Sequence, residues 1–190
     1  MKALAICGSP RENGNTERLL HRCLESLRGA GHEVEMLGVK GLNITPCDGC
    51  GACGKTQDGT CAIAGDDFDR AFKAMVSADI LVVGSPVYFG SATPQIMALL
   101  DRAGYVSRAN GSLFARKLGG PIVVARRAGQ NFTFAQLLMW FMINDFVVPG
   151  SSYWNVAVGR AAGDVEGDEE GLRTVDRFAE NLNWLAGKLA

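Results

Sequence analysis

The chain has 190 residues, enough for one compact domain with a sizeable core. Hydrophobic residues make up 47% of it and charged residues 21%, which is ordinary for a globular protein. Because a chain of this length can bury most of its surface, it needs neither a metal nor a disulfide merely to fold. The formal net charge of -1 gives no reason to expect nucleic acid or an anionic membrane as partner. No stretch is long enough to span a bilayer, and the apolar run before Gly8 is too short for a secretory signal. We therefore expect a cytoplasmic protein.

Short apolar strands alternate with helical periodicities along the chain. The pattern predicts strands at residues 2–7, 33–37, 80–84 and 121–125, and a last strand within 147–158. Helices are expected at 16–27, about 66–77, 94–102, 132–143 and 171–189. This alternation predicts a single α/β domain over residues 1–190, with a five-stranded parallel sheet and helices on both faces. Ligands of such sheets bind beyond the carboxyl ends of the strands.

The loop after the first strand leads directly into a helix, which predicts an anion-binding site. Free backbone N–H groups and the helix dipole favour negative charge at such a helix start. Ser9, Asn15 and Thr16 add neutral donors and Arg11 adds a cation, a set that suits a monophosphate. The alternative is an ordinary strand–helix turn with a good N-cap. The loop lacks the G-x-G-x-x-G pattern of dinucleotide-binding proteins.

A cysteine-rich loop is inserted at about residues 41–65, and loops of this length are usually functional. Its spacing is C-x2-C-x2-C-x7-C, similar to the ligand set of a 4Fe-4S cluster. Four thiolates would also suit a tetrahedral zinc ion, and cysteines in such a loop can stay free, so three alternatives remain open. Gly49–Thr56 matches a nucleotide-triphosphate loop, but neither a strand before it nor a helix after it is expected. The candidate metal ligands are Cys47, Cys50, Cys53 and Cys61.

The loop after the third strand carries two aromatic residues and a glycine at the expected ligand edge. Aromatic rings offer flat faces for stacking, and glycine lets the backbone approach a ring system closely. Alternatively, the two aromatics are ordinary core or interface residues. The candidate ring-binding residues of this loop are Tyr88, Phe89 and Gly90.

Three segments together resemble the NADPH-dependent FMN reductase family: Gly8–Thr16, Ser85–Gly90 and Leu100–Arg102. The cysteine loop resembles the iron–sulfur flavoprotein branch of that family, and the resemblance covers residues 1 to about 150. It implies a three-layer, flavodoxin-like fold that binds FMN, with the strand order 2-1-3-4-5. The FMN phosphate would be held by Ser9, Arg11, Asn15 and Thr16. The isoalloxazine ring would lie along Pro86, Val87, Tyr88, Phe89 and Gly90, with Gly129 on its other side.

The same resemblance implies an oxidoreductase that takes hydride from NAD(P)H at FMN, or electrons from a ferredoxin-like donor, and reduces a second acceptor. No protein nucleophile is needed, so we nominate no catalytic acid or base. Two alternatives are a non-enzymatic electron carrier of flavodoxin type and a redox or metal-binding module based on the cysteines. The resemblance also implies a homodimer or homotetramer. Residues 132–143, apolar nearly all round, are either a subunit interface or a helix buried within its own domain.

Overall fold

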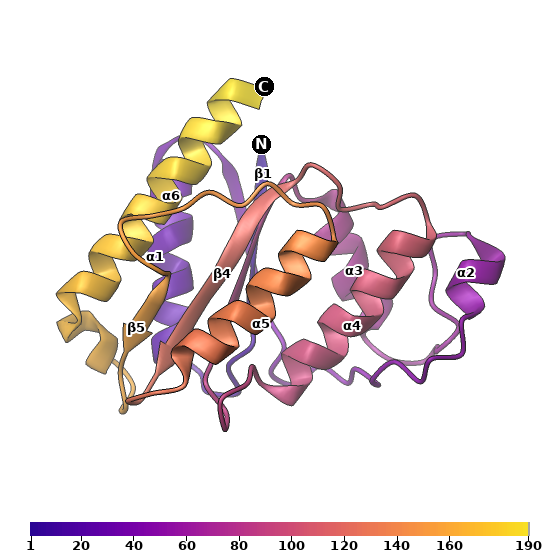
Figure 1. Cartoon of the computed structure of the whole chain (residues 1–190), viewed down its shortest axis with the longest axis horizontal. Coiled ribbons are helices and arrows are strands. Elements are labelled where there is room, and N and C mark those ends of the chain that lie inside the picture. The colour runs from indigo at the N-terminus through magenta and orange to yellow at the C-terminus, as the bar shows by residue number, and fades with distance from the viewer. Residues whose placement is uncertain (190) are drawn as a thin grey trace.

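The computed structural model describes residues 1–189 and contains a five-stranded sheet in the order β2-β1-β3-β4-β5 (Figure 1). Each pairing between neighbouring strands is parallel. The α/β class and the predicted strand order are therefore confirmed. The strands are β1 Lys2–Cys7, β2 Glu33–Gly38, β3 Ile80–Pro86, β4 Leu118–Ala125 and β5 Val156–Val158.

Helices cover both faces of the sheet, and the alternation of side chains along each strand decides which helices it contacts. Leu4 and Ile6 of β1 pack into the core shared with α3, α4 and α5, whereas Ala3 and Ala5 face α1 and α6. Figure 1 places the short α2 beside α4, at the far end of the molecule from α6. The helices are α1 Asn15–Gly29, α2 Ala52–Thr56, α3 Phe68–Ser77, α4 Pro94–Ala109, α5 Gln130–Ile143, the 3-10 helix η1 Asp164–Gly167 and α6 Glu169–Leu189.

Helix α4 runs to Ala109 and does not end near residue 102 as predicted. Gly104 does not interrupt it, because α5 packs closely at this point. A Cβ at Gly104 would lie 3.1 Å from the indole nitrogen of Trp140, and that nitrogen donates to the carbonyl of Leu100 at 2.8 Å. Tertiary packing thus outweighs the weak helix preference of glycine.

Strand β4 begins at Leu118, earlier than the predicted start at Pro121. The sequence misses this part of the strand because it contains two glycines, which disfavour strands locally. A Cβ at Gly119 would lie 2.1 Å from the carbonyl oxygen of Leu81. The neighbouring strand therefore comes so close that glycine is needed here.

The loop after β1 is fixed against the start of α4. The Gly8 N–H donates to the carbonyl of Gly84 at 2.7 Å, and the Thr93 hydroxyl donates to the carbonyl of Gly8 at 2.7 Å. A Cβ at Gly8 would lie 2.9 Å from the Cβ of Ile96, so this close approach requires glycine. The loops after β1 and β3 are thereby held side by side at the carboxyl edge. Among residues 1–189 we find no helix with the length and apolar character needed to cross a membrane.

Candidate functional site

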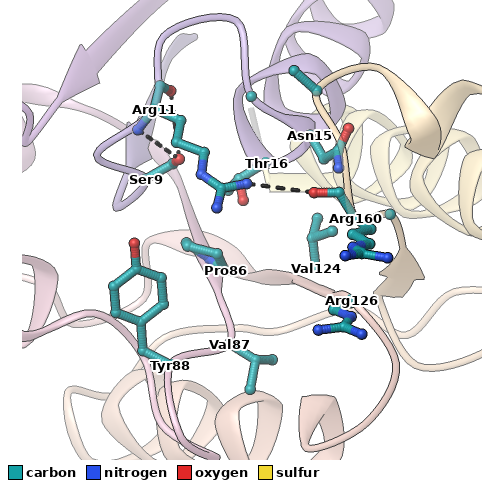
Figure 2. Close-up of a pocket in the computed structure, with 13 residues that line it drawn as sticks. Ser9, Arg11, Asn15, Thr16, Pro86, Val87, Tyr88, Val124, Arg126 and Arg160 are labelled. Carbon is teal, nitrogen blue, oxygen red and sulfur yellow. Dashed lines mark hydrogen bonds between the residues drawn. The ribbon is translucent and has the colours of Figure 1, made fainter.

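A pocket of about 240 Å³ opens at the carboxyl edge of the sheet, where the loops after β1, β3, β4 and β5 meet. Figure 2 shows Ser9 and Arg11 on one side of it and Val87 and Tyr88 on the other. The structure thus brings the predicted phosphate loop and part of the predicted ring-binding loop together. The pocket is lined by Ser9, Arg11, Gly14, Asn15, Thr16, Pro86, Val87, Tyr88, Val124, Arg126, Gly159, Arg160 and Ala162.

The first turn of α1 presents uncapped backbone to this pocket. The N-cap residue is Gly14, and no side chain caps the first N–H groups of the helix. The structure therefore lacks the side-chain cap that ordinary strand–helix turns commonly have. Leading N–H groups without a side-chain acceptor, next to the positive end of a helix dipole, form the arrangement that binds anions. Thr16, 2% exposed, lies in this first turn and lines the pocket.

Ser9 and Arg11 are arranged by hydrogen bonds within the loop. The Ser9 hydroxyl oxygen accepts a hydrogen bond from the Arg11 N–H at 3.1 Å. The Arg11 guanidinium extends across the mouth of the pocket and donates to the carbonyl of Arg160 at 3.4 Å (Figure 2). Arg11 therefore contributes its charge to the pocket and also joins the loop after β1 to the loop after β5.

The Asn15 side chain faces the segment after β5. Its Nδ2 donates to the carbonyl of Ala161 at 2.8 Å, and its Oδ1 accepts from the Gly163 N–H at 2.9 Å. A Cβ at Gly159 would lie 2.5 Å from Nδ2, which requires glycine there. Both polar atoms of the side chain are thus engaged by protein backbone, which leaves the backbone N–H and the second Nδ2–H of Asn15 for a ligand.

Two arginines that the sequence analysis did not nominate, Arg126 and Arg160, also line the pocket. They follow the carboxyl ends of β4 and β5. Because ligands bind at this edge of the sheet, the position of the two arginines in the sequence could have identified them as candidates. Asp164 fixes the turn that carries Arg160, because its carboxylate accepts the Arg160 N–H at 3.1 Å. With Arg11, three guanidinium groups surround the pocket, a charge distribution that favours a phosphate ligand.

Phe89 and Gly90 form the tip of a tight turn at the edge of the pocket. Tyr88 and Ser91 close it, with N–H to carbonyl distances of 2.8 and 3.0 Å. Phe89 has φ 52° and Gly90 φ 82°, the left-handed region that favours glycine. Phe89 is fully exposed and so is no core aromatic. It and Gly90 lie outside the pocket and line a neighbouring hollow together with Arg126.

Gly129 lies directly against this turn. It is the N-cap residue of α5, with φ 89°. A Cβ here would lie 3.1 Å from Cγ1 of Val87 and 3.4 Å from Cα of Gly90. The glycine therefore allows the start of α5 to approach the backbone of the loop after β3.

The four loop cysteines line a second cavity, of about 100 Å³, between the cysteine loop and α4. All four are free thiols; Cys50 is exposed and the others are half-buried. The loop contains the short helix α2, which the sequence did not predict and which carries Cys53. Gly49 and Gly51, with φ 72° and 69°, turn the chain around the cavity. Within residues 1–189 no three His, Cys, Asp or Glu side chains are grouped tightly enough to hold a metal ion.

Residues 1–161 match the family described as NADPH-dependent FMN reductase. The chain belongs to this family. The protein is therefore a flavin-dependent oxidoreductase, and the predicted family resemblance is confirmed.

Within the FMN reductase family, similar proteins are named iron–sulfur flavoproteins. One from Methanocaldococcus jannaschii is 36% identical over 189 residues, covering 96% of this chain and 95% of its own length. One from Methanosarcina thermophila is 32% identical over 190 residues, covering 96% and 93%. A solved structure of RosB with a bound 8-demethyl-8-formylriboflavin-5'-phosphate intermediate aligns with a TM-score of 0.79 and 19% identity, over all of this chain and 80% of RosB. At that identity, RosB shows the shared fold alone.

In this member of the FMN reductase family, α5 buries only one of its faces. Leu137 and Phe141 are buried, but the opposite side of the helix is apolar and exposed. The alternative that α5 is buried within its own domain is therefore wrong for that side. The exposed apolar residues of α5 are Phe132, Met139, Met142 and Ile143.

Proposed function

We propose that the pocket at the carboxyl edge binds FMN with its phosphate at the start of α1. Ser9, Arg11 and Thr16, with the backbone N–H of Asn15, hold the phosphate in this arrangement. The ring lies along Pro86, Val87 and Tyr88, with Phe89, Gly90 and Gly129 at its margin. The observation that carries the proposal is the uncapped start of α1, which faces three arginines and opens into the same pocket as Tyr88.

When bound, FMN supplies the capacity to accept a hydride and to release electrons, so the chain itself provides orientation and electrostatics. Pro86 and Val87 offer an apolar surface that excludes water from one side of a flat ring. The Val87 N–H donates to the carbonyl of Val124 at 2.9 Å, which fixes that surface to the sheet. We propose NAD(P)H as the electron donor because the family is described as NADPH-dependent. A ferredoxin-like protein is the alternative donor.

We further propose that Cys47, Cys50, Cys53 and Cys61 hold a 4Fe-4S cluster. In its favour, all four line one cavity and all four are free thiols. A single zinc ion needs its four sulfurs within one shell of about 2.3 Å radius, whereas the ligands of a cluster bind separate irons. Because no three ligating side chains in residues 1–189 are close enough to share one metal ion, the four cysteines fit a cluster better than a zinc ion. Such a cluster supplies one-electron transfer when bound.

The exposed apolar side of α5 supports an assembly of two or more copies of the chain. Large contiguous apolar surface is uncommon on proteins that remain monomeric. We expect a homodimer or homotetramer with this side of α5 at the interface. Met139→Lys with Met142→Lys should give a smaller species in sedimentation velocity, and an unchanged sedimentation coefficient would contradict the interface.

Anaerobic purification followed by absorption spectroscopy tests the proposed function. Protein with one FMN per chain that bleaches when NADPH is added supports the reductase, whereas bleaching only by reduced ferredoxin supports the protein donor. Iron and acid-labile sulfide in equal amounts support the cluster. A protein unable to take up FMN would overturn the pocket assignment, and an iron-free anaerobic preparation would overturn the cluster.

A further inference from the structure

Arg102 of α4 is fully buried in the wall of the cysteine cavity. Its side chain has no exposed surface, and Cζ lies 4.0 Å from the centre of the Phe68 ring. A buried guanidinium is stable only when hydrogen-bond acceptors and an opposite charge surround it. Arg102 does not line the pocket proposed for FMN, so that proposal leaves it without a role.

The three hydrogen-bond acceptors of Arg102 lie at the two ends of the cysteine loop. Nη1 donates to the carbonyl of Thr45 at 3.1 Å and also to the carboxylate of Asp66. Nη2 donates to the carbonyl of Ile63 at 2.8 Å. Thr45 precedes the four cysteines in the chain and Ile63 follows them, so Arg102 closes the loop that carries the thiols.

Asp66 supplies the opposite charge, and its side chain is 4% exposed. Burial raises the pKa of this carboxyl. However, the N–H groups of Thr45 and Phe68, at 2.9 and 3.1 Å, and the Arg102 guanidinium outweigh burial, and the pKa lies below its ordinary value. Asp66 therefore stays ionised near neutral pH, and the Arg102–Asp66 pair carries no net charge.

One nitrogen of Arg102 makes no hydrogen bond within residues 1–189. Nε is buried, and among the described residues it has no hydrogen-bond acceptor. Guanidinium groups have five N–H donors, and a buried donor without an acceptor destabilises a folded protein. The cavity is lined by the sulfur atoms of the four cysteines and by the carboxylate of Asp48. Asp48 is exposed and its carboxylate already accepts the Cys50 N–H at 3.0 Å, so the sulfur atoms are the acceptors we consider for Nε. Sulfur becomes a strong acceptor when it is a thiolate or a sulfide bound to iron.

We propose that Arg102 donates its Nε–H to a sulfur of the iron–sulfur group held by the four cysteines, and that the Arg102–Asp66 pair sets its reduction potential. This inference rests on the proposed cluster. One-electron reduction adds one negative charge to the group, so a hydrogen bond to its sulfur stabilises the reduced form more and raises the potential. Removing a negative charge near the group also favours its reduced form and raises the reduction potential.

Two single variants separate this role from a merely structural one. Arg102→Lys keeps the positive charge next to Asp66 but removes Nε–H, and Asp66→Asn keeps the Arg102 donor but removes a negative charge. Arg108→Lys, on the exposed side of the same helix, is the matched control. Iron, sulfide and FMN contents and the one-electron potential of the cluster would be measured anaerobically for each protein.

We expect Arg102→Lys to lower the equilibrium constant for cluster reduction about tenfold. This corresponds to a reduction potential about 59 mV lower for a one-electron couple. Asp66→Asn should shift the potential upward, and the control should leave it unchanged. An Arg102→Lys protein with full iron and an unchanged potential would overturn the inference but leave the cluster standing. If the Arg102→Lys protein holds no iron, the test rests on the Asp66→Asn protein. A cluster potential above that of the wild type supports the inference, and an unchanged or lower potential overturns it. Wild-type protein without iron overturns both the inference and the cluster.

Discussion

The side-chain oxygen of Asn15, in the first turn of α1, accepts a hydrogen bond from the Gly163 N–H at 2.9 Å, although the two residues are 148 positions apart. The amide nitrogen of the same side chain donates to the carbonyl of Ala161. One asparagine thus fixes the segment that carries Arg160 against the start of α1. The shape of the pocket depends on this connection.

Replacing Asn15 should therefore affect both stability and ligand binding. Asn15→Ala leaves the Gly163 N–H and the Ala161 carbonyl without partners, so we expect the free energy of unfolding to fall by about 1–3 kcal/mol. FMN affinity should fall roughly tenfold, because the segment that carries Arg160 loses its anchor. Urea denaturation and fluorescence titration with FMN measure the two effects.

The matched control is Asn181→Ala. Asn181 donates to the carbonyl of Gly150 at 2.7 Å, away from the pocket. This change should lower stability slightly and leave FMN affinity unchanged. Equal losses of FMN affinity in both variants would refute the proposed role of Asn15.

Arg126 and Arg160 should bind the charged end of the ligand. We expect Arg126→Gln or Arg160→Gln to weaken FMN binding roughly five- to tenfold, about 1 kcal/mol, because both side chains are exposed and a solvated ion pair contributes modestly. Riboflavin, which lacks the phosphate, should bind both variants as it binds the wild type. Arg173→Gln, on an exposed position of α6, is the control. A parallel loss of riboflavin affinity would argue against phosphate contacts.

Phe89 should be more important for function than for folding. Its φ of 52° is unfavourable for a side chain other than glycine, and the ring is fully exposed. Phe89→Gly should therefore leave stability unchanged or raise it by up to about 1 kcal/mol. We expect the rate of flavin reduction by NADPH to fall severalfold in stopped-flow measurements, because an exposed ring at the pocket margin suits contact with a second substrate. Phe89→Gly protein that is reduced at the wild-type rate would contradict this role.

The two cysteines outside the loop should make the protein sensitive to alkaline pH. Burial raises the pKa of the Cys7 thiol to about 11 and that of Cys23 to about 12, from an ordinary value of 9.0. Between pH 9 and 11 the unfolded chain therefore binds fewer protons at these thiols than the folded chain does. The free energy of unfolding should fall with rising pH in this window, by up to about 1.4 kcal/mol per pH unit for each thiol.

Urea denaturation under reducing conditions at pH 8 to 11 measures this slope. The double variant Cys7→Ala with Cys23→Ala should have a lower stability at pH 8 and a shallower decline above pH 9. Because the other groups titrate in both proteins, the difference between the two slopes reports the two buried thiols alone. An identical decline in both proteins would show that the buried thiols do not cause it.

The local pattern of the sequence determined the fold and the place of the site. Apolar strands that alternate with helices are compatible with few sheet topologies. Parallel strands need crossover connections, and these connections are almost always right-handed. The position of the ligand edge follows from that pattern of strands and helices, and the order 2-1-3-4-5 follows from the family resemblance. Ser9, Arg11, Thr16, Val87 and Tyr88 were therefore found from the sequence, and the structure brings all of them to one pocket.

Only the tertiary structure decided which distant residues complete the pocket. Arg126 and Arg160 follow β4 and β5, whose ends meet the start of α1 only after the sheet has formed. Gly119 lies in a strand because Leu81 of the neighbouring strand approaches it, which no local preference encodes. The orientation of the Asn15 side chain depends on Gly163 in the same way. Local patterns record which residues are apolar and which are flexible, whereas these contacts join residues tens to more than a hundred positions apart.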